Sequence, residues 1–132
     1  MIGGQCVFYQ MVRLILVSSV LITLSACQTG STNENLINKV NSIDDSWVNY
    51  EGEQENNNTM IQSQFIPYDP AKEYEVNYPT YIAYYDGEEF LETIRHQDTP
   101  ATVETVEEAD GVIVSFNKKN KNGMQMVIKD EQ

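Results

Sequence analysis

Apolar and polar residues divide the chain into one uninterrupted apolar stretch and a long series of short apolar runs. No charged residue occurs from Leu14 to Ala26, and after Cys27 the apolar residues return only in short runs separated by polar turns. Short runs rich in Val, Ile, Tyr and Phe, bounded by Gly, Pro, Asn and Asp, are typical of β-strands. Because no long amphipathic helix interrupts them, the pattern predicts an antiparallel β-sandwich or barrel.

Eight or nine short strands are predicted from nine such runs. They are residues 36–37, 47–48, 60–66, 74–76, 78–85, 88–94, 102–106, 111–116 and 124–128. Asp86-Gly87 separates two of them and is the strongest hairpin signal in the chain. Residues 51–59, EGEQENNNT, contain no apolar side chain and are predicted to be a loop, and residues 118–123 are predicted to be a turn.

The first 26 residues have the layout of an export signal. Arg13 supplies a positive charge, Leu14 to Leu24 an apolar run, and Ser25-Ala26 the small residues of a cleavage site. The run is shorter than the roughly 20 residues that a membrane span needs. Residues 1–10 contain no basic residue, so Met11 fits better as the start of the signal.

Leu24-Ser25-Ala26-Cys27 resembles the lipobox of bacterial lipoproteins: an aliphatic residue, two small residues and a cysteine. The resemblance implies that Cys27 is acylated, becomes the first residue of the mature protein and anchors it to membrane lipid. Several acyl chains together give stable anchoring. The alternative is an ordinary secretory signal followed by a chance cysteine. Residues 27–34 are small and polar and are predicted to be a lipidated, flexible tether, and residues 35–130 the sandwich domain.

Charge narrows the classes of partner. All 20 acidic residues follow Cys27, together with seven of the eight basic ones, which leaves a formal charge of −13 on the mature chain. This balance excludes the basic surface that nucleic-acid binding requires, and it disfavours contact with anionic lipid headgroups. No second cysteine remains after Cys27, so no intrachain disulfide is available, which fits a bacterium with a single membrane.

A series of short motifs follows the tether in a fixed order. The motifs are Asn35-Leu36-Ile37, Trp47, Ser63-Gln64-Phe65-Ile66-Pro67, Lys72-Glu73-Tyr74, Ala83-Tyr84-Tyr85-Asp86, Glu108-Ala109-Asp110, Val114-Ser115-Phe116 and Met124. In this order they resemble the small, jelly-roll modules of the carbohydrate-binding type in phage tail and cell-wall proteins of Gram-positive bacteria. The resemblance spans residues 35–128 and implies a jelly-roll-like sandwich. Most of the matching residues belong to the core and turns, so they indicate fold more than ligand.

Candidate catalytic and metal-binding groups are sparse. His96, the only histidine, lies in a polar stretch and is predicted to be a solvated loop residue. The pairs Glu88-Glu89 and Glu107-Glu108 would point to opposite faces of a strand, so they are poor candidates for a joint carboxylate site. No phosphate loop, zinc spacing or nucleophile elbow occurs, and we predict that the chain is not an enzyme. A Ca²⁺ ion could use Asp69 or Asp86, although no ligand spacing requires a cofactor or metal.

Aromatic residues are the candidates for ligand contact, because sugars pack their C–H faces on rings while polar side chains bond their hydroxyls. The candidates are Trp47, Tyr50, Tyr78, Tyr81, Tyr84 and Tyr85. Strand alternation places Tyr81 and Tyr85 on one face and Tyr84 on the other, so one of these sets must face the core. A glycan-binding surface is expected to show coplanar exposed rings flanked by polar groups.

Two functions fit these observations. The first is a lipid-anchored protein on the outer face of a Gram-positive membrane, whose sandwich binds cell-wall glycan or another surface carbohydrate. The second is a protein-interaction or structural module that binds no sugar and docks a surface protein through a sheet face or edge. One version of this second hypothesis is that the module derives from a phage. An apolar patch or an open strand edge would favour the second function.

Overall fold

Nine β-strands and two short 3₁₀ helices make up residues 34–129, the part of the chain that this computed structural model describes. In chain order they are η1 (Lys39–Asn41), β1 (Ile43–Val48), β2 (Gln54–Gln62), β3 (Ile66–Pro67), β4 (Tyr74–Val76), β5 (Thr80–Asp86), β6 (Glu89–His96), β7 (Ala101–Thr102), β8 (Gly111–Asn117), η2 (Lys118–Asn120) and β9 (Met126–Ile128). The predicted export signal and Cys27 lie outside the described residues. Within residues 34–129, no helix has the length and apolarity that crossing a membrane requires.

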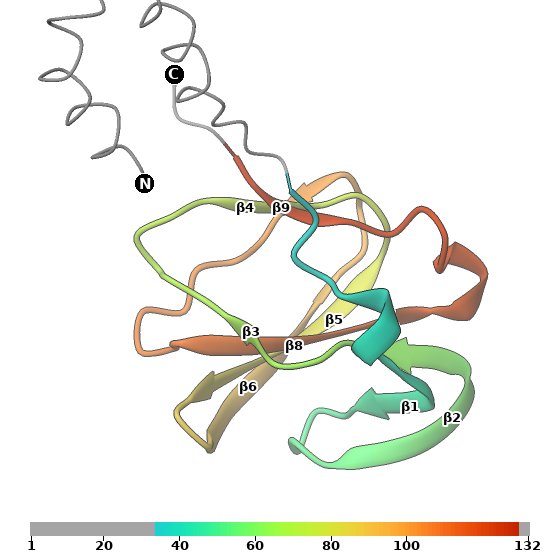
Figure 1. The fold of residues 1–132 in the computed structure, drawn as a ribbon. Helices are drawn as coiled ribbons and strands as arrows, with labels where there is room; N and C mark the ends of the chain where they lie inside the picture. The colour runs from blue at the N-terminus through green and yellow to red at the C-terminus, as the bar shows by residue number, and fades with distance from the viewer. Residues whose placement is uncertain (1–33, 130–132) are drawn as a thin grey trace, which may run out of the picture. The chain divides into compact units, whose positions relative to one another are not determined.

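The strands form two antiparallel sheets, so the prediction of an all-β sandwich is confirmed. The large sheet has the order β1-β2-β8-β5-β6, with β3 also pairing with β8, and the small sheet has the order β7-β4-β9. Figure 1 shows the small sheet at the top, the large sheet below it and the β1–β2 hairpin at the bottom. Strand β8 is central because β2, β3 and β5 all pair with it.

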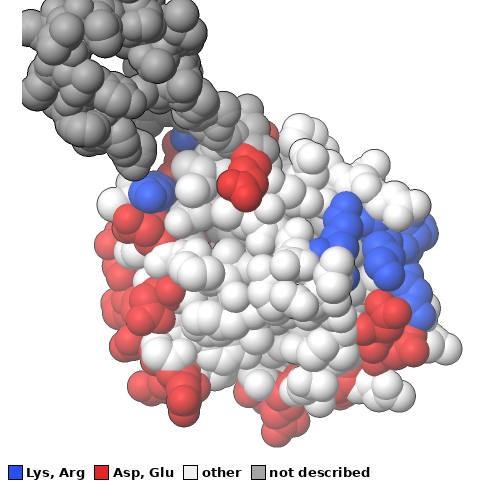
Figure 2. Space-filling view, viewed as in Figure 1, with Lys and Arg blue, Asp and Glu red and all other residues white. Residues whose placement is uncertain are grey.

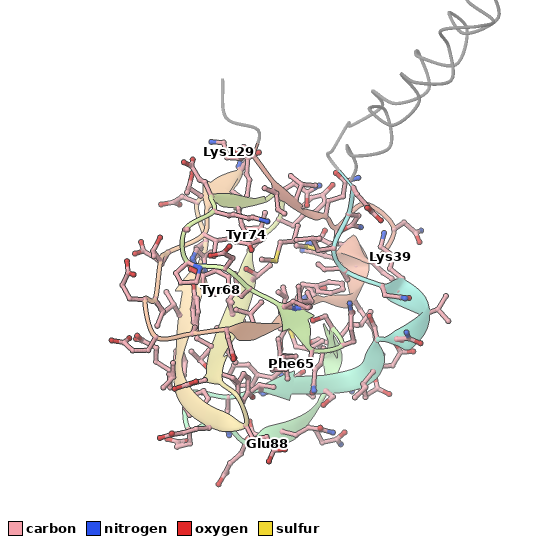
Figure 3. The ribbon with its side chains drawn as sticks, turned by 60° about the vertical axis from the view of Figure 1, so that its left-hand side comes forward. Lys39, Phe65, Tyr68, Tyr74, Glu88 and Lys129 are labelled. Carbon is pink, nitrogen blue, oxygen red and sulfur yellow. The ribbon has the colours of Figure 1, made fainter. Side chains whose placement is uncertain are left out.

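The core lies between the two sheets and follows the two-residue alternation of β5 and β8. Side chains on the inner faces of the strands are buried and form one apolar cluster. The cluster includes Ile82, Tyr84, Val112, Val114 and Phe116 of the large sheet, and Tyr74, Val76 and Met126 of the small sheet. Figure 3 shows Tyr68 and Tyr74 side by side between the sheets, where their rings stack 5.1 Å apart. Burying each large apolar side chain contributes about 1.5–3 kcal/mol, so this cluster is the main source of stability.

The start of the domain is attached to the last strand. Leu36 N donates to Met126 O at 2.8 Å, and Asn35 Oδ1 accepts hydrogen bonds from the backbone N–H groups of Ile37 and Met126. Asn35 Nδ2 also donates to Met124 O. One asparagine side chain thus holds the entering segment beside β9. The strand predicted at residues 36–37 is absent, because this segment is held by one main-chain bond and the Asn35 side chain rather than by a ladder.

The predicted loop at residues 51–59 is wrong, because β2 begins at Gln54. Gln54, Glu55 and Asn56 pair with Val48, Trp47 and Ser46 of β1. All three β2 residues are exposed, so no buried side chain marks this part of the strand in the sequence. Main-chain pairing with β1 alone defines it.

The strand predicted at residues 60–66 is divided. Its ends pair with the same edge of β8, but Ser63 lies between them and uses its side chain in the ladder. Ser63 Oγ accepts from Val114 N at 2.9 Å, while Ser63 N donates to Val114 O at 2.8 Å. The strand predicted at residues 102–106 is also shorter than expected, because β7 contains only Ala101 and Thr102.

The β1–β2 hairpin bends sharply along its length. Asp44 pairs with Ile61, whereas Ser46, only two residues later, pairs with Asn56. Asp45, between them, has a positive φ of 61°, which an Asp tolerates better than most residues. Because four residues of β2 pass opposite this one residue, the distal half of the hairpin turns away from the plane of the sheet.

The bent hairpin lies over the outer face of the large sheet. Val48 N donates to Ser115 Oγ of β8 at 3.2 Å, and Thr93 Oγ1 of β6 donates to Asn49 O at 2.9 Å. Three residues of the large sheet are buried although their side chains face away from the small sheet: Ala83, Thr93 and Ser115. The hairpin therefore forms a partial third layer.

Candidate functional site

A groove lies between the bent hairpin and the outer face of the large sheet, with a volume of about 330 Å³. We call it the Trp47 groove. The hairpin contributes Trp47, Asn57, Thr59 and Met60 to its lining, and the segment around β5, β6 and β8 contributes Pro79, Thr80, Tyr81, Arg95 and Asn117. It lies at the bend opposite Asp45, where Asn57 to Met60 have no partner on β1.

Three of the six predicted aromatic residues form one cluster, and two of them, Trp47 and Tyr81, line the groove. Trp47 and Tyr81 have ring centroids 4.9 Å apart, and Tyr50 lies 6.2 Å from Trp47 and 6.1 Å from Tyr81. The interplanar angles are 67°, 88° and 81°, so the rings meet edge to face. The expectation of coplanar rings is therefore wrong. Edge-to-face pairs of this kind contribute about 0.5–1.5 kcal/mol beyond their buried area, so the arrangement is a rigid corner.

Hydrogen bonds fix the orientation of the Trp47 ring. Its Nε1 donates to Glu55 Oε1 at 3.0 Å, across the β1–β2 pair. This bond uses the single donor of the indole. The ring can therefore offer a ligand only its apolar surface.

Arg95 lies on the opposite side of the groove. Tyr81 and Arg95 are directly paired across β5 and β6, and the guanidinium carbon is 5.5 Å from the centre of the Tyr81 ring. A cation at this distance from an aromatic face is stabilised by the ring quadrupole. Tyr81 thus holds the guanidinium at the groove while leaving its N–H donors available.

Two asparagines add directional groups. Asn57 Oδ1 accepts from the N–H and hydroxyl of Thr59, and Asn117 Oδ1 accepts from Lys119 N. In the described part of the chain, neither side-chain amide nitrogen donates a hydrogen bond. Both asparagines therefore have a fixed amide orientation with donors left for a ligand, which is the combination of apolar surface and few polar groups typical of small-molecule sites.

The other predicted aromatic residues lie elsewhere. Tyr84 has no exposed surface, and its hydroxyl donates to Glu104 O at 2.7 Å, so it cannot contact a ligand. Burial raises the pKa of the Tyr84 hydroxyl well above its ordinary value. Tyr85 packs between Phe65 and Phe90 near the β5–β6 turn, and Tyr78 is 37% exposed just before β5. The sequence-based set thus divides into a corner of three rings and three separate residues.

The prediction that His96 is a solvated loop residue is wrong. His96 is the last residue of β6 and is buried, with only 6% of its surface exposed, rather than solvated in a loop. Nε2 accepts a hydrogen bond from Glu104 N at 2.9 Å, which requires the neutral imidazole. Burial is the main reason why the pKa of His96 is lowered. Two buried atoms have no hydrogen-bond partner in the described region: Nδ1 of His96 and Oγ1 of Thr80, which is paired with His96 across β5 and β6.

A second hollow of about 340 Å³ lies near Tyr68, Tyr74 and Ile128. The tyrosine hydroxyls are already used, because Tyr74 Oη accepts from Asp69 N and Tyr68 Oη accepts from Val106 N. These bonds hold the Pro67–Glu73 connection against the core. The hollow therefore has a structural explanation and offers few groups for a polar ligand.

Neither aspartate considered for Ca²⁺ belongs to a cluster of ligands. Asp69 Oδ1 caps a turn by accepting from Ala71 N, and Asp86 is exposed at the end of β5. Among residues 34–129, no group of three or more His, Cys, Asp or Glu side chains is arranged to hold a metal ion.

The surface charge is unevenly distributed. Figure 2 shows acidic side chains along the left and lower margins of the domain, a group of basic side chains on the right and a few more at the upper left. Two lysines pair with acidic residues of β1, Lys118 with Asp45 and Lys121 with Asp44. These pairs are more than a third exposed, so each contributes little to stability.

Five polar residues of the Trp47 groove were not predicted as site residues: Asn57, Thr59, Thr80, Arg95 and Asn117. Counting back from a two-residue loop at the β5–β6 turn would place Ile94, and not Arg95, opposite Tyr81. A bulge between Tyr84 and Tyr85 shifts the register by one residue. No known protein family, no curated protein and no solved structure matches the chain.

Proposed function

We propose that the chain is an exported lipoprotein, anchored through Cys27 on the outer face of the cell membrane, whose sandwich binds cell-wall glycan in the Trp47 groove. The observation that carries the binding proposal is the pairing of fixed aromatic surface with unused side-chain donors in one groove. Trp47 and Tyr81 offer apolar faces, and Asn57, Arg95 and Asn117 offer N–H groups. Sugar rings present the complementary combination of C–H faces and hydroxyls.

Binding to purified wall glycan tests the groove. The full-length protein in detergent is titrated with soluble wall glycan, and Trp47→Ala is expected to weaken binding about tenfold, as the loss of a central aromatic contact does. Trp47→Phe keeps a ring and should retain part of the affinity. Tyr78→Ala is the matched control, because Tyr78 is also an exposed ring but does not line the groove. Wild-type affinity in Trp47→Ala would contradict the proposal.

Fractionation tests the anchor separately. Cys27→Ala removes the only acceptor for lipid after the export signal, so the variant is expected to leave the membrane fraction and appear in the medium or remain unprocessed. Wild-type protein should incorporate labelled fatty acid and the variant should not. A Cys27→Ala protein that is processed normally and stays in the membrane pellet would contradict lipid anchoring.

A protein-binding function has one observation in its favour. β6 ends the order of the large sheet, and within the described residues its outer edge pairs with no other strand. An extended peptide could add to such an edge, although Glu89, Glu92 and Arg95 work against unselective pairing. Protease treatment of the wall preparation separates the two functions: capture that survives digestion supports glycan binding, and capture that is lost supports a protein partner.

A further inference from the structure

The Trp47 groove carries a charge opposite to that of the protein. Among the described residues that line it, Arg95 is the only charged one and none is a carboxylate. The whole chain has a formal charge of −12. The groove is therefore a small positive site on an acidic molecule, and its charge needs a separate explanation.

Structural pairing does not supply that explanation. The four ion pairs among residues 34–129 are made by Lys118, Lys121 and Lys129, and Arg95 takes part in none of them. The Arg95 side chain is exposed and lies over the ring of Tyr81. Within residues 34–129, the guanidinium donates no hydrogen bond to another protein group.

We infer that the groove selects glycans that carry an oxyanion, a carboxylate or a phosphate, next to a sugar ring. This inference rests on the proposed glycan binding and specifies its ligand class. Guanidinium binds both oxyanions through paired N–H donors, which gives charge-assisted hydrogen bonds. Trp47 and Tyr81 contact the ring, and Arg95 contacts the anionic group.

The acidic surface confines this selection to the groove. A protein with excess negative charge repels anionic polymers over distances of about a Debye length, roughly 8 Å at physiological salt. Anionic glycan gains affinity only where the cation of the groove is in contact with it. Arg95 therefore determines specificity at short range, while the remainder of the surface opposes nonspecific adhesion to the same polymers.

Three probes and two charge variants test the inference on the full-length protein in detergent. The probes are a neutral N-acetylglucosamine oligomer, a uronate-containing oligosaccharide of equal length and a glycerol-phosphate polymer that bears sugars. We expect one or both anionic probes to bind at least about tenfold more tightly than the neutral one, in line with hydrogen bonds to charged groups. The two anionic probes distinguish carboxylate from phosphate.

Arg95→Gln should abolish the preference, lowering affinity for the anionic probe about tenfold while changing affinity for the neutral oligomer less than about threefold. Arg95→Lys keeps the positive charge but lacks the paired N–H donors of the guanidinium, so it should retain a reduced preference for the anionic probe. Lys119→Gln is the matched control, because it removes one exposed positive charge outside the groove.

The outcomes separate this inference from the proposed function. Neutral and anionic probes that bind equally, or a loss in Lys119→Gln equal to that in Arg95→Gln, would overturn the role of Arg95 while glycan binding stands. If none of the probes binds and wall glycan does not bind either, the proposed function fails first.

Discussion

Replacing Gly52 by alanine tests whether the bent hairpin is held against the large sheet. Gly52 has φ +83°, and a Cβ atom there would come within 2.8 Å of three ring carbons of Phe90, including Cγ. An L-residue in this left-handed conformation costs about 1–2 kcal/mol, and overpacking against the ring costs about 1–3 kcal/mol. We expect Gly52→Ala to lower the free energy of unfolding by about 2–5 kcal/mol, a large part of the 5–15 kcal/mol typical of a domain.

Urea unfolding followed by tryptophan fluorescence measures this loss, since Trp47 lies in the same hairpin. Gly87→Ala is the matched control: its φ is +64° but a Cβ atom would meet nothing within 4 Å, so only the backbone cost of about 1–2 kcal/mol applies. In a Phe90→Ala background, Gly52→Ala should cost no more than Gly87→Ala does. If Gly52→Ala and Gly87→Ala destabilise the wild-type protein equally, the hairpin does not pack on Phe90 as described and the reasoning is refuted.

Three further predictions follow from buried polar groups. Tyr84→Phe removes the hydroxyl that donates to Glu104 O, and it should lower the free energy of unfolding in urea by about 0.5–1.5 kcal/mol; no loss would mean that the bond is not formed. Because burial lowers the pKa of His96 below 6.5, the folded protein binds fewer protons than the unfolded chain, so stability should fall as the pH drops below about 6.5. Urea unfolding from pH 8 to 5 checks this, and His96→Gln should flatten the slope in that range; an equal slope in the variant would assign it to other groups. Asn35→Ala removes three hydrogen bonds to the backbone and should cost about 1–3 kcal/mol, with faster amide exchange in β9 than in β8; unchanged exchange would contradict attachment of the entering segment to β9.

Much of the fold could be predicted from the sequence because burial leaves a pattern. Along β5 and β8, buried apolar residues of the inner face alternate with residues of the outer face. Both strands were therefore predicted within two residues of their ends. The first half of β2 could not be predicted, since its side chains are exposed and its place depends on main-chain bonds to β1. Exposed strands held only by backbone pairing leave no period in the sequence.

The site was predictable only in part. Trp47, Tyr50 and Tyr81 were chosen for their chemistry, but alternation could not tell which face of β5 lies inward, so Tyr84 was included although it is in the core. Arg95 was missed because the strand was predicted to end at Ile94, whereas β6 continues to His96 and places Arg95 opposite Tyr81. A bulge between Tyr84 and Tyr85 sets this register. A one-residue shift in register exchanges the two faces of a strand, and nothing local in the sequence marks this bulge.

The attachment of the entering segment to β9 determines how the molecule is displayed. Asn35 and Leu36 join the small sheet, whereas the Trp47 groove opens on the side of the large sheet that faces away from it. A support fixed to the beginning of the domain, whether a bilayer or a biosensor chip, therefore holds the sandwich by one layer and leaves the opposite layer clear. If the groove binds glycan as proposed, one long polymer can therefore reach the grooves of several neighbouring molecules without passing between them and their support.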